Sequence, residues 1–486
     1  MALEPKNLLV LMSDEHAPQA MGCAAHPLVR TPHLDGLAAR GLRFTSAYCT
    51  SPICVPSRAG FATGKYQHQV GYWDNADAYD GAVPSWHHHL RGSGHRVVSI
   101  GKLHFRGLPG DDHGFSEEIL AMHVVEGLGD VKGLVRSEIP RRKGYDKLAS
   151  MAGAGETPYT RYDRDIASRA SDWLRNEAPK WRARPWALFV SFVCPHFPLI
   201  APPEFFALYP PERIALPKQY RPAERPRHPY LSDYHGCVGY DDGFDGDHAK
   251  VRRALAGYLG LVSFMDDNVG KVLRTLDECG LGADTRVVYT SDHGDNMGAR
   301  GLWGKSTMYE ESAGVPLILA GPGIPARASC AAPTSHIDLF AFFLEATGTP
   351  PPSGNYRGVS PLALAAGGHD GRTVLSEYHA IGSTGGVTML RKGRWKYVYY
   401  VGYPPQLFDL ERDPQELADI AGDRAHAPIL RELEAELRRH LDPEEVNARA
   451  KRRQAQLLAR YGGREAALAR GDLNYTPAPG QAPDMN

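Results

Sequence analysis

The chain of 486 residues has 42% hydrophobic and 23% charged residues, as globular proteins do, and is long enough for one large core and a smaller appended domain. Its formal net charge of -1 leaves no electrostatic footprint for nucleic acid or an anionic membrane, so we expect any bound anion to be small. Seven cysteines without CxxC spacing argue against a disulfide framework and a structural zinc site.

The N-terminal region predicts a cytoplasmic protein without membrane contact. Residues 1–6 are polar, and the apolar run over residues 8–12 is too short for a signal-peptide core or a membrane span. A buried strand is expected over residues 7–13, ending in Asp14-Glu15, and a helix over residues 33–40 follows it.

The segment from Cys54 to Arg58 places a thiol beside a proline, a hydroxyl and a guanidinium at the expected start of a helix, with Thr63-Gly64 beyond. Pro56 suits a first helical position, and the unpaired amides of a first helical turn favour anions. This segment therefore predicts a site for anion chemistry.

The central part of the chain alternates strands and helices. A second apolar run over residues 186–193 ends close to His196, and residues 251–276 keep helical spacing over seven turns. A strand over residues 286–290 then leads into Asp292-His293. Residues 316–320 and a helix over residues 337–344 continue the alternation. This alternation predicts an α/β fold with a large, mostly parallel sheet covered by helices on both faces.

Polar clusters follow three of the expected strands. Ligands of such sheets bind beyond the carboxyl ends of the strands, where Asp14-Glu15, His196 and Asp292-His293 all stand. We therefore expect these clusters to converge. Carboxylates alone would repel an anion, so their presence beside an anion site implies a divalent metal, and oxygen donors with one imidazole suit calcium, magnesium or manganese.

Three regions are expected: an N-terminal α/β domain over residues 1–368, a C-terminal antiparallel sheet with a covering helix over 369–442, and a helical, basic and Pro-rich tail over 443–486. The tail is either a solvated helix or an oligomer contact. Residues 106–160 carry many glycines with little periodicity, which is typical of a lid or binding loop and also of a plain surface excursion. Strands of the second sheet are expected over residues 373–377, 387–391, 395–401 and 406–410, and its helix over 429–440.

The Cys-x-Pro-Ser-Arg element at Cys54, followed by Thr63-Gly64, resembles the signature of the type I sulfatases of the alkaline phosphatase superfamily, and the order of the clusters resembles that superfamily over nearly the whole chain. The resemblance implies hydrolysis of sulfate monoesters by a hydrated formylglycine made from Cys54. It also implies a small anionic ester as substrate, a formylglycine-generating enzyme as transient partner, and a homo-oligomer.

The resemblance also implies a metal site. In the family an aspartate pair from the first strand, a further Asp with Asn or His, and the formylglycine hold the ion. The matching positions here are Asp14, Cys54, Asp292 and His293. The pair reads Asp14-Glu15 rather than Asp-Asp, which leaves Glu15 as a ligand and the identity of the metal open.

Further matches carry catalytic and substrate-binding roles. In Gly101-Lys102-Leu103-His104, Lys102 would steady the nucleophile and the sulfate while His104 handles the proton of the hydrate. His196 would donate to the leaving group or bind sulfate, and Lys305 would contact the sulfate oxygens. Two further residues complete this set: Arg58, which would neutralise charge near residue 54 or cap a carboxylate, and Asn75, which would hydrogen-bond the transferring group.

Within the superfamily the match is to the choline sulfatase and related bacterial branch, through Asp74-Asn75-Ala76, residues 86–91, 292–295 with 300–303, and 395–399. Choline sulfate, aryl sulfates and small alkyl sulfates remain candidate substrates. The alternative is a phosphonate monoester or phosphodiester hydrolase, which shares fold, metal and formylglycine. In that group hydroxyl side chains replace the Lys and His of Gly-Lys-x-His, so Lys102 and His104 favour a sulfatase with some promiscuity.

Overall fold

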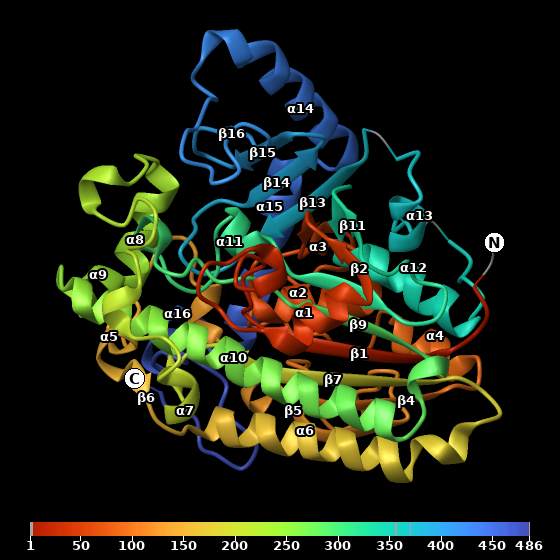
Figure 1. The fold of residues 1–486 in the computed structure, drawn as a ribbon. Coiled ribbons are helices and arrows are strands. Elements are labelled where there is room, and N and C mark those ends of the chain that lie inside the picture. Colours follow the sequence, from red (N-terminus) through yellow and green to blue (C-terminus); the bar gives the residue numbers. More distant parts are fainter. Residues whose placement is uncertain (1–2, 355–356, 370, 486) are drawn as a thin grey trace.

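The computed structural model describes residues 3–354, 357–369 and 371–485 and is built around one eight-stranded sheet (Figure 1). The strand order is β11-β2-β10-β9-β1-β7-β4-β5. Five of the seven pairings are parallel, and only β10 runs antiparallel to its neighbours, so the expected mostly parallel sheet is confirmed. The strands are β1 (Asn7–Asp14), β2 (Gly41–Phe44), β4 (Arg96–Lys102), β5 (Glu117–Met122), β7 (Trp186–Pro195), β9 (Thr285–Ser291), β10 (Leu317–Ala320) and β11 (Ala328–Cys330).

Strand β1 shows why this sheet is covered on both faces. Successive side chains of a strand point to opposite faces. Leu9 and Leu11 accordingly enter one hydrophobic core, while Leu8, Val10 and Met12 enter another, and all five are fully buried. A continuous apolar run is therefore what this position requires, which explains why the strand was visible in the sequence.

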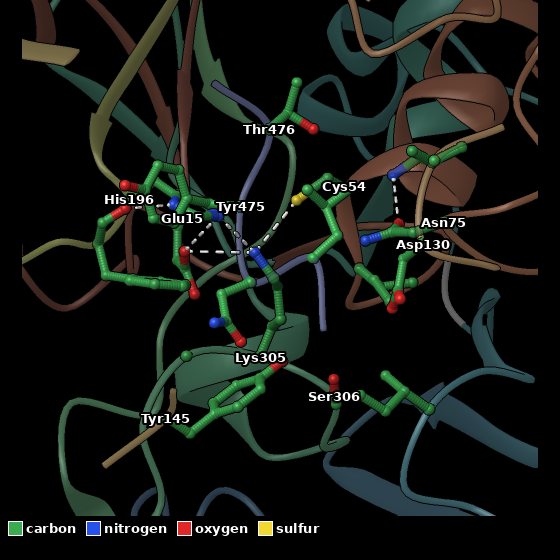
Figure 2. A pocket seen from close by; sticks show the side chains of 18 of the residues that line it. Glu15, Cys54, Asn75, Asp130, Tyr145, His196, Lys305, Ser306, Tyr475 and Thr476 are labelled. Atoms are coloured by element: carbon green, nitrogen blue, oxygen red, sulfur yellow. Dashed lines mark hydrogen bonds and ion pairs between the residues drawn. The ribbon is translucent and has the colours of Figure 1, made fainter. Parts of the chain in front are cut away.

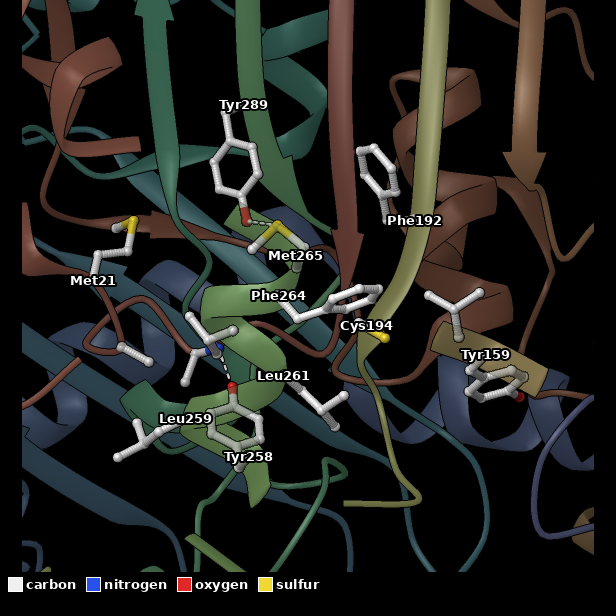
Figure 3. Packing of buried hydrophobic residues seen from close by; sticks show 14 of the residues in the cluster. Met21, Tyr159, Phe192, Cys194, Tyr258, Leu259, Leu261, Phe264, Met265 and Tyr289 are labelled. Atoms are coloured by element: carbon white, nitrogen blue, oxygen red, sulfur yellow. Dashed lines mark hydrogen bonds between the residues drawn. The ribbon is translucent and has the colours of Figure 1, made fainter. Parts of the chain in front are cut away.

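Helices form the two outer layers. One face is covered by α1 (Pro32–Ala39), α6 (Pro158–Asn176) and α10 (His248–Glu278), and α6 and α10 lie side by side in Figure 1. The other face is covered by α2 (Cys54–Thr63), α4 (Trp86–Gly92) and α12 (His336–Thr347). Figure 3 shows α10 packed against β7 and β9, where the Tyr289 hydroxyl donates to the Met265 sulfur at 3.4 Å.

The expected C-terminal sheet is present, above the main sheet in Figure 1. Its antiparallel strands are β13 (Thr373–Tyr378), β14 (Val387–Lys392), β15 (Trp395–Tyr400) and β16 (Gln406–Asp409). Leu433 and Leu437 of α14 (Ala427–His440) pack on it, as the predicted covering helix should. The chain divisions at residues 368 and 442 stay predictions.

The C-terminal helices α15 (Pro443–Tyr461) and α16 (Gly463–Ala469) leave this sheet and return to the N-terminal part of the chain. Ala467 packs with Val131, Leu134 and Val135, which belong to the glycine-rich region over residues 106–160. An oligomer contact through this tail stays a prediction. Within the described part of the chain, every helix is too short or too polar to cross a bilayer.

Candidate active site

The structure brings the three polar clusters together beyond the carboxyl ends of β1, β7 and β9. Ligand atoms of Asp14, Cys54, Asp292 and His293 lie within 4.8 Å of one another, and so do those of Asp14, Glu15 and His196. Asp14 is common to both groups. One site is therefore assembled from strands that are far apart in the sequence, as the parallel topology predicted.

Cys54 is the first residue of α2, all ten residues of which are buried. Pro56 occupies the third helical position rather than the expected first one, where its missing N–H still costs no helical hydrogen bond. The amide oxygen of Asn75 accepts a hydrogen bond from Val55 N–H at 3.1 Å, which leaves the Asn75 amino group for the pocket that both residues line. Burial raises the pKa of the Cys54 thiol to about 12, so the unmodified side chain is a poor nucleophile at neutral pH.

Two buried cations hold the carboxylates of the site. Lys102 Nζ lies 2.6 Å from Asp14 Oδ2, and Arg58 joins Asp14 Oδ2 at 3.0 Å to Asp292 Oδ2 at 2.7 Å. Burial opposes ionisation of Asp14, but Lys102 and Arg58 hold its pKa well below the usual range. Arg58 thus pairs with two carboxylates beside residue 54, and its role in catalysis stays a prediction.

Lys305 stands at the centre of the pocket (Figure 2). Its ammonium nitrogen lies 3.1 Å from Cys54 Sγ and 3.0 Å from His196 Nε2. His196 Nδ1 lies 2.8 Å from the Phe197 carbonyl, which only accepts, so Nδ1 carries the proton and Nε2 presents its lone pair to Lys305. Burial, together with the charge of Lys305, lowers the pKa of His196 well below its usual value.

Glu15 lies on the Lys305 and His196 side of the site and outside the group that holds Asp292 and His293. Its Oε2 is 3.3 Å from both Lys305 Nζ and His196 Nε2, whereas its buried Oε1 has no hydrogen-bond partner among the described residues. Burial raises the pKa of Glu15 to about 7. Its role as a metal ligand stays a prediction.

The residues present fit a divalent ion. His293 Nδ1 donates to the Gly294 carbonyl at 2.9 Å, which leaves Nε2 as a lone pair 3.6 Å from Asp292 Oδ1 and 3.2 Å from Cys54 Sγ. A carbonyl behind an imidazole in this way is the usual arrangement of a metal-bound histidine. Together with the ionised Asp14 carboxylate, these donors suit a hard cation that accepts one imidazole.

The last part of the chain closes the pocket, which sequence reasoning missed. The pocket is a cavity of about 60 Å³ whose wall includes His104 and the tail residues 473–476. His104 Nε2 lies 2.7 Å from Thr476 Oγ1, and Tyr475 packs edge-on against Phe197. A short polar segment among prolines carries no pattern that would point to this role. Aromatic side chains missed in the same wall are Tyr145, Tyr234, Tyr240 and Tyr475.

Comparison with known proteins agrees with this geometry. The Sulfatase family profile matches residues 6–349, and the profile described as N-sulphoglucosamine sulphohydrolase, C-terminal, matches residues 298–442. The choline-sulfatase of Rhizobium meliloti (strain 1021) is 33% identical over 475 residues, which cover 94% of this chain and 90% of that protein. Arylsulfatase K of Bos taurus is 29% identical over 436 residues, covering 85% and 78% of the two chains.

Solved structures give the same fold. The phosphonate monoester hydrolase of Silicibacter pomeroyi superposes with a TM-score of 0.72 at 25% identity, over 90% of this chain and 95% of that one. The phosphonate monoester hydrolase of Agrobacterium radiobacter superposes equally well, with a TM-score of 0.72 over 99% of both chains, and at 21% identity it supports the fold alone. Because the family profile covers most of the chain and ligand atoms of Asp14, Cys54, Asp292 and His293 lie within 4.8 Å of one another, this protein belongs to the Sulfatase family and is a sulfuric ester hydrolase.

Proposed function

We propose that this sulfatase cleaves small alkyl and aryl sulfates with a formylglycine made from Cys54 and one divalent ion, either calcium, manganese or magnesium. The observation that carries the proposal is the position of Cys54 Sγ. It lies 3.1 Å from Lys305 Nζ and 3.2 Å from His293 Nε2, so residue 54 stands between a cation suited to sulfate oxygens and the residues suited to a metal. The ion would be held by Asp14, Asp292, His293 and residue 54, and would supply positive charge for the ester oxygens.

The need for conversion follows from the chemistry of the thiol. A thiolate that attacked sulfur would leave a stable adduct without a ready exit, and burial already keeps the Cys54 thiol protonated. A hydrated aldehyde at this position supplies one hydroxyl that attacks sulfur as the bond to the leaving oxygen breaks, and a second whose deprotonation expels sulfate and restores the aldehyde. Transient contact with a formylglycine-generating enzyme is part of this proposal, as are a homo-oligomer and a place in the cytoplasm.

Two lysines supply positive charge from the protein itself. Burial disfavours a charged Lys305, but the carboxylates of Glu15 and Asp14 raise its pKa, so it remains an ammonium. Lys102 Nζ stands 2.6 Å from the Asp14 carboxylate. Fixed cations in a preorganised site stabilise the charge that develops on the sulfate oxygens.

Two histidines are placed to move protons. The Lys305 ammonium donates a hydrogen bond to His196 Nε2 at 3.0 Å. We assign to this pair the proton that the leaving oxygen takes up. His104 is buried, and burial with the nearby Lys102 and Arg58 lowers its pKa well below the usual value. It is therefore neutral and able to accept a proton from the hydrate, in contact with the Thr476 hydroxyl.

The wall of the cavity suits a small substrate, and choline sulfate is one candidate. Tyr145, Tyr240 and Tyr475 line the cavity, and aromatic faces attract quaternary ammonium groups. Asp130 also lines it but is paired with Arg142 at 2.8 Å, so the aromatic faces would contribute more to such recognition. The similarity to the choline-sulfatase of Rhizobium meliloti supports this candidate.

A phosphonate monoester hydrolase activity is the second candidate, supported by the likeness to the Silicibacter pomeroyi enzyme. Lys102 and His104 weigh against it as the main activity, because hydroxyl side chains stand at these positions in that group. Both kinds of substrate present a monoanionic tetrahedral centre, so low promiscuous turnover of phosphonate monoesters is expected.

The proposal is tested in two steps. Mass spectrometry of the tryptic peptide that holds residue 54 separates cysteine from formylglycine. Rates with choline sulfate, an aryl sulfate and a phosphonate monoester are then compared for the wild type and for Cys54→Ala, which should lose turnover of all three and keep its fold. Full aryl sulfate turnover by Cys54→Ala, or by wild type that carries only cysteine, would contradict the proposed nucleophile. A higher kcat/KM for the phosphonate monoester would favour the second candidate.

A further inference from the structure

Two histidines and a glutamate meet at the edge of the main sheet, outside the cavity around Cys54. His113 Nδ1 lies 2.9 Å from Glu118 Oε1, and His123 Nε2 lies 3.2 Å from Glu118 Oε2. Ligand atoms of all three lie within 4.8 Å of one another. Glu118 belongs to the edge strand β5, His113 precedes it in a loop, and His123 follows it.

A bulge in β5 brings Glu118 and His123 to the same side. Residues five apart in a regular strand point to opposite faces. Here Ile100 pairs with Ile119, while Lys102 pairs with Met122, so β5 contains one residue more than β4 between the two pairings. Leu120, within this stretch, has a φ of 51°, a left-handed conformation that residues other than glycine rarely adopt.

The third residue of the group is held by packing. The His113 ring is buried, with its centroid 5.1 Å from that of Phe105 and 6.1 Å from that of Tyr79. The side chains of Glu118 and His123 are 24% and 22% exposed, so the group is open to solvent on one side. One buried ligand with two partly exposed ones forms a group that an ion can approach from water.

The donor set and its spacing suit a transition metal. Ligand atoms about 2.0–2.2 Å from a tetrahedral zinc ion lie about 3.3 Å apart, close to both separations seen here. Two imidazoles with one carboxylate favour zinc and its neighbours in the first transition row over calcium or magnesium. This group therefore differs in preference from the oxygen-rich site around Asp14.

We propose that His113, Glu118 and His123 form a second metal site that binds zinc with three protein ligands and one open position. The inner nitrogens, His113 Nε2 and His123 Nδ1, have no hydrogen-bond partner among the described residues. Tightly held zinc has such partners behind its histidines, so the ion at this site exchanges with solution.

Zinc at this site stabilises the folded protein because the ligands are assembled only there. The backbone around His123 is joined to the end of β4: His104 N–H donates to the Met122 carbonyl at 2.8 Å, and Val124 N–H to the Phe105 carbonyl at 3.0 Å. An ion that ties His113 to His123 would therefore fasten the loop between them to this ladder.

The test compares the full-length wild type with Glu118→Gln, His123→Ala and a control, His248→Ala. His248 is the first residue of α10 and lies outside the described metal-ligand groups. After equilibrium dialysis against a fixed Zn²⁺ concentration, elemental analysis corrected for free zinc should give one zinc equivalent more for wild type and His248→Ala than for the other two. Zn²⁺ should raise the Tm of wild type and His248→Ala more than that of the two site variants, and Co²⁺ should show d–d absorption that both site variants lose.

Zinc bound around Asp14 is common to all four proteins and cancels in the comparison. Glu118→Gln preserves the size of the side chain and keeps the test valid if His123→Ala folds poorly. Equal zinc content in the wild type and Glu118→Gln, with equal Tm shifts, would overturn the proposal. This result does not depend on the state of residue 54 or on the substrate.

Discussion

The ammonium nitrogen of Lys305 lies 3.1 Å from the sulfur of Cys54, although 251 positions separate the two residues. We predict that Lys305→Ala lowers kcat for an aryl sulfate by roughly 10²–10³, the usual loss when one fixed donor to the developing charge is removed. Lys305→Arg keeps the charge and should retain more turnover than the alanine variant. If Lys305→Ala has the kcat of the wild type and an unchanged free energy of unfolding, Lys305 does not take part in the reaction.

Removal of the metal should abolish turnover while the fold persists. Arg58 and Lys102 already neutralise the carboxylates of Asp14 and Asp292, so the site does not need the ion to hold its shape. After chelation and dialysis we expect aryl sulfate turnover to be lost and to return with calcium, manganese or magnesium, and Asp292→Asn to need a higher metal concentration. Activity that survives at zero measured metal content would contradict this assignment.

The tail segment should govern access to the cavity. A chain that ends at Asp472 keeps the contacts of that residue with Lys132 and Arg142 but loses Tyr475 and Thr476 from the cavity wall. We expect a higher KM for small sulfates and a smaller difference in kcat/KM between small and bulky ones. A chain that ends at Gln481 keeps residues 473–476 and is the matched control. Identical KM values for both chains would show that the tail does not form the wall in solution.

Glu377 should stabilise the folded protein near neutral pH, and this contribution should be lost in acid. It is buried on β13, and although burial opposes ionisation, His68 at 2.7 Å and His379 lower its pKa from 4.5 to about 2. Between pH 4.5 and pH 2 the unfolded chain therefore binds a proton that the folded protein does not, so stability falls as the pH falls through this window, by up to about 3 kcal/mol. Urea unfolding should show a shallower fall for Glu377→Gln. If the free energy of unfolding falls equally with pH in the two proteins, the lowered pKa of Glu377 is contradicted.

Much of the fold was predictable because its strands are buried on both faces. Apolar runs such as residues 186–193 follow directly from that burial, and the polar clusters after them were expected to meet because parallel strands end on one edge. The reversal of β10 was not predictable, since a strand of four apolar residues carries no sign of its direction. The helix α6 was also missed, because its buried face includes the polar residues Thr160, Asp163 and Ser171, which weaken the apolar spacing.

In the site, the residues that stand in recognisable sequence motifs were predictable, whereas the residues that form the wall of the cavity were not. Lys102, His104 and Lys305 stand in short motifs whose order along the chain is informative. Thr476 reaches His104 across 372 positions, and only the packing of the folded chain brings them together. The same holds for the tyrosines of the cavity, which are ordinary core residues by sequence pattern.

The burial of Cys54 sets a time limit for the proposed conversion to formylglycine. Cys54 is 1% exposed, every residue of α2 is buried, and the returning tail forms part of the wall of the cavity that Cys54 lines. An enzyme that oxidises this thiol must reach it before the surrounding layers close. At about 5–20 residues per second, a ribosome needs about 20–80 s to travel from residue 54 to residue 476. Slower translation would lengthen this interval and raise the converted fraction, whereas folded chains that escaped conversion would stay inert.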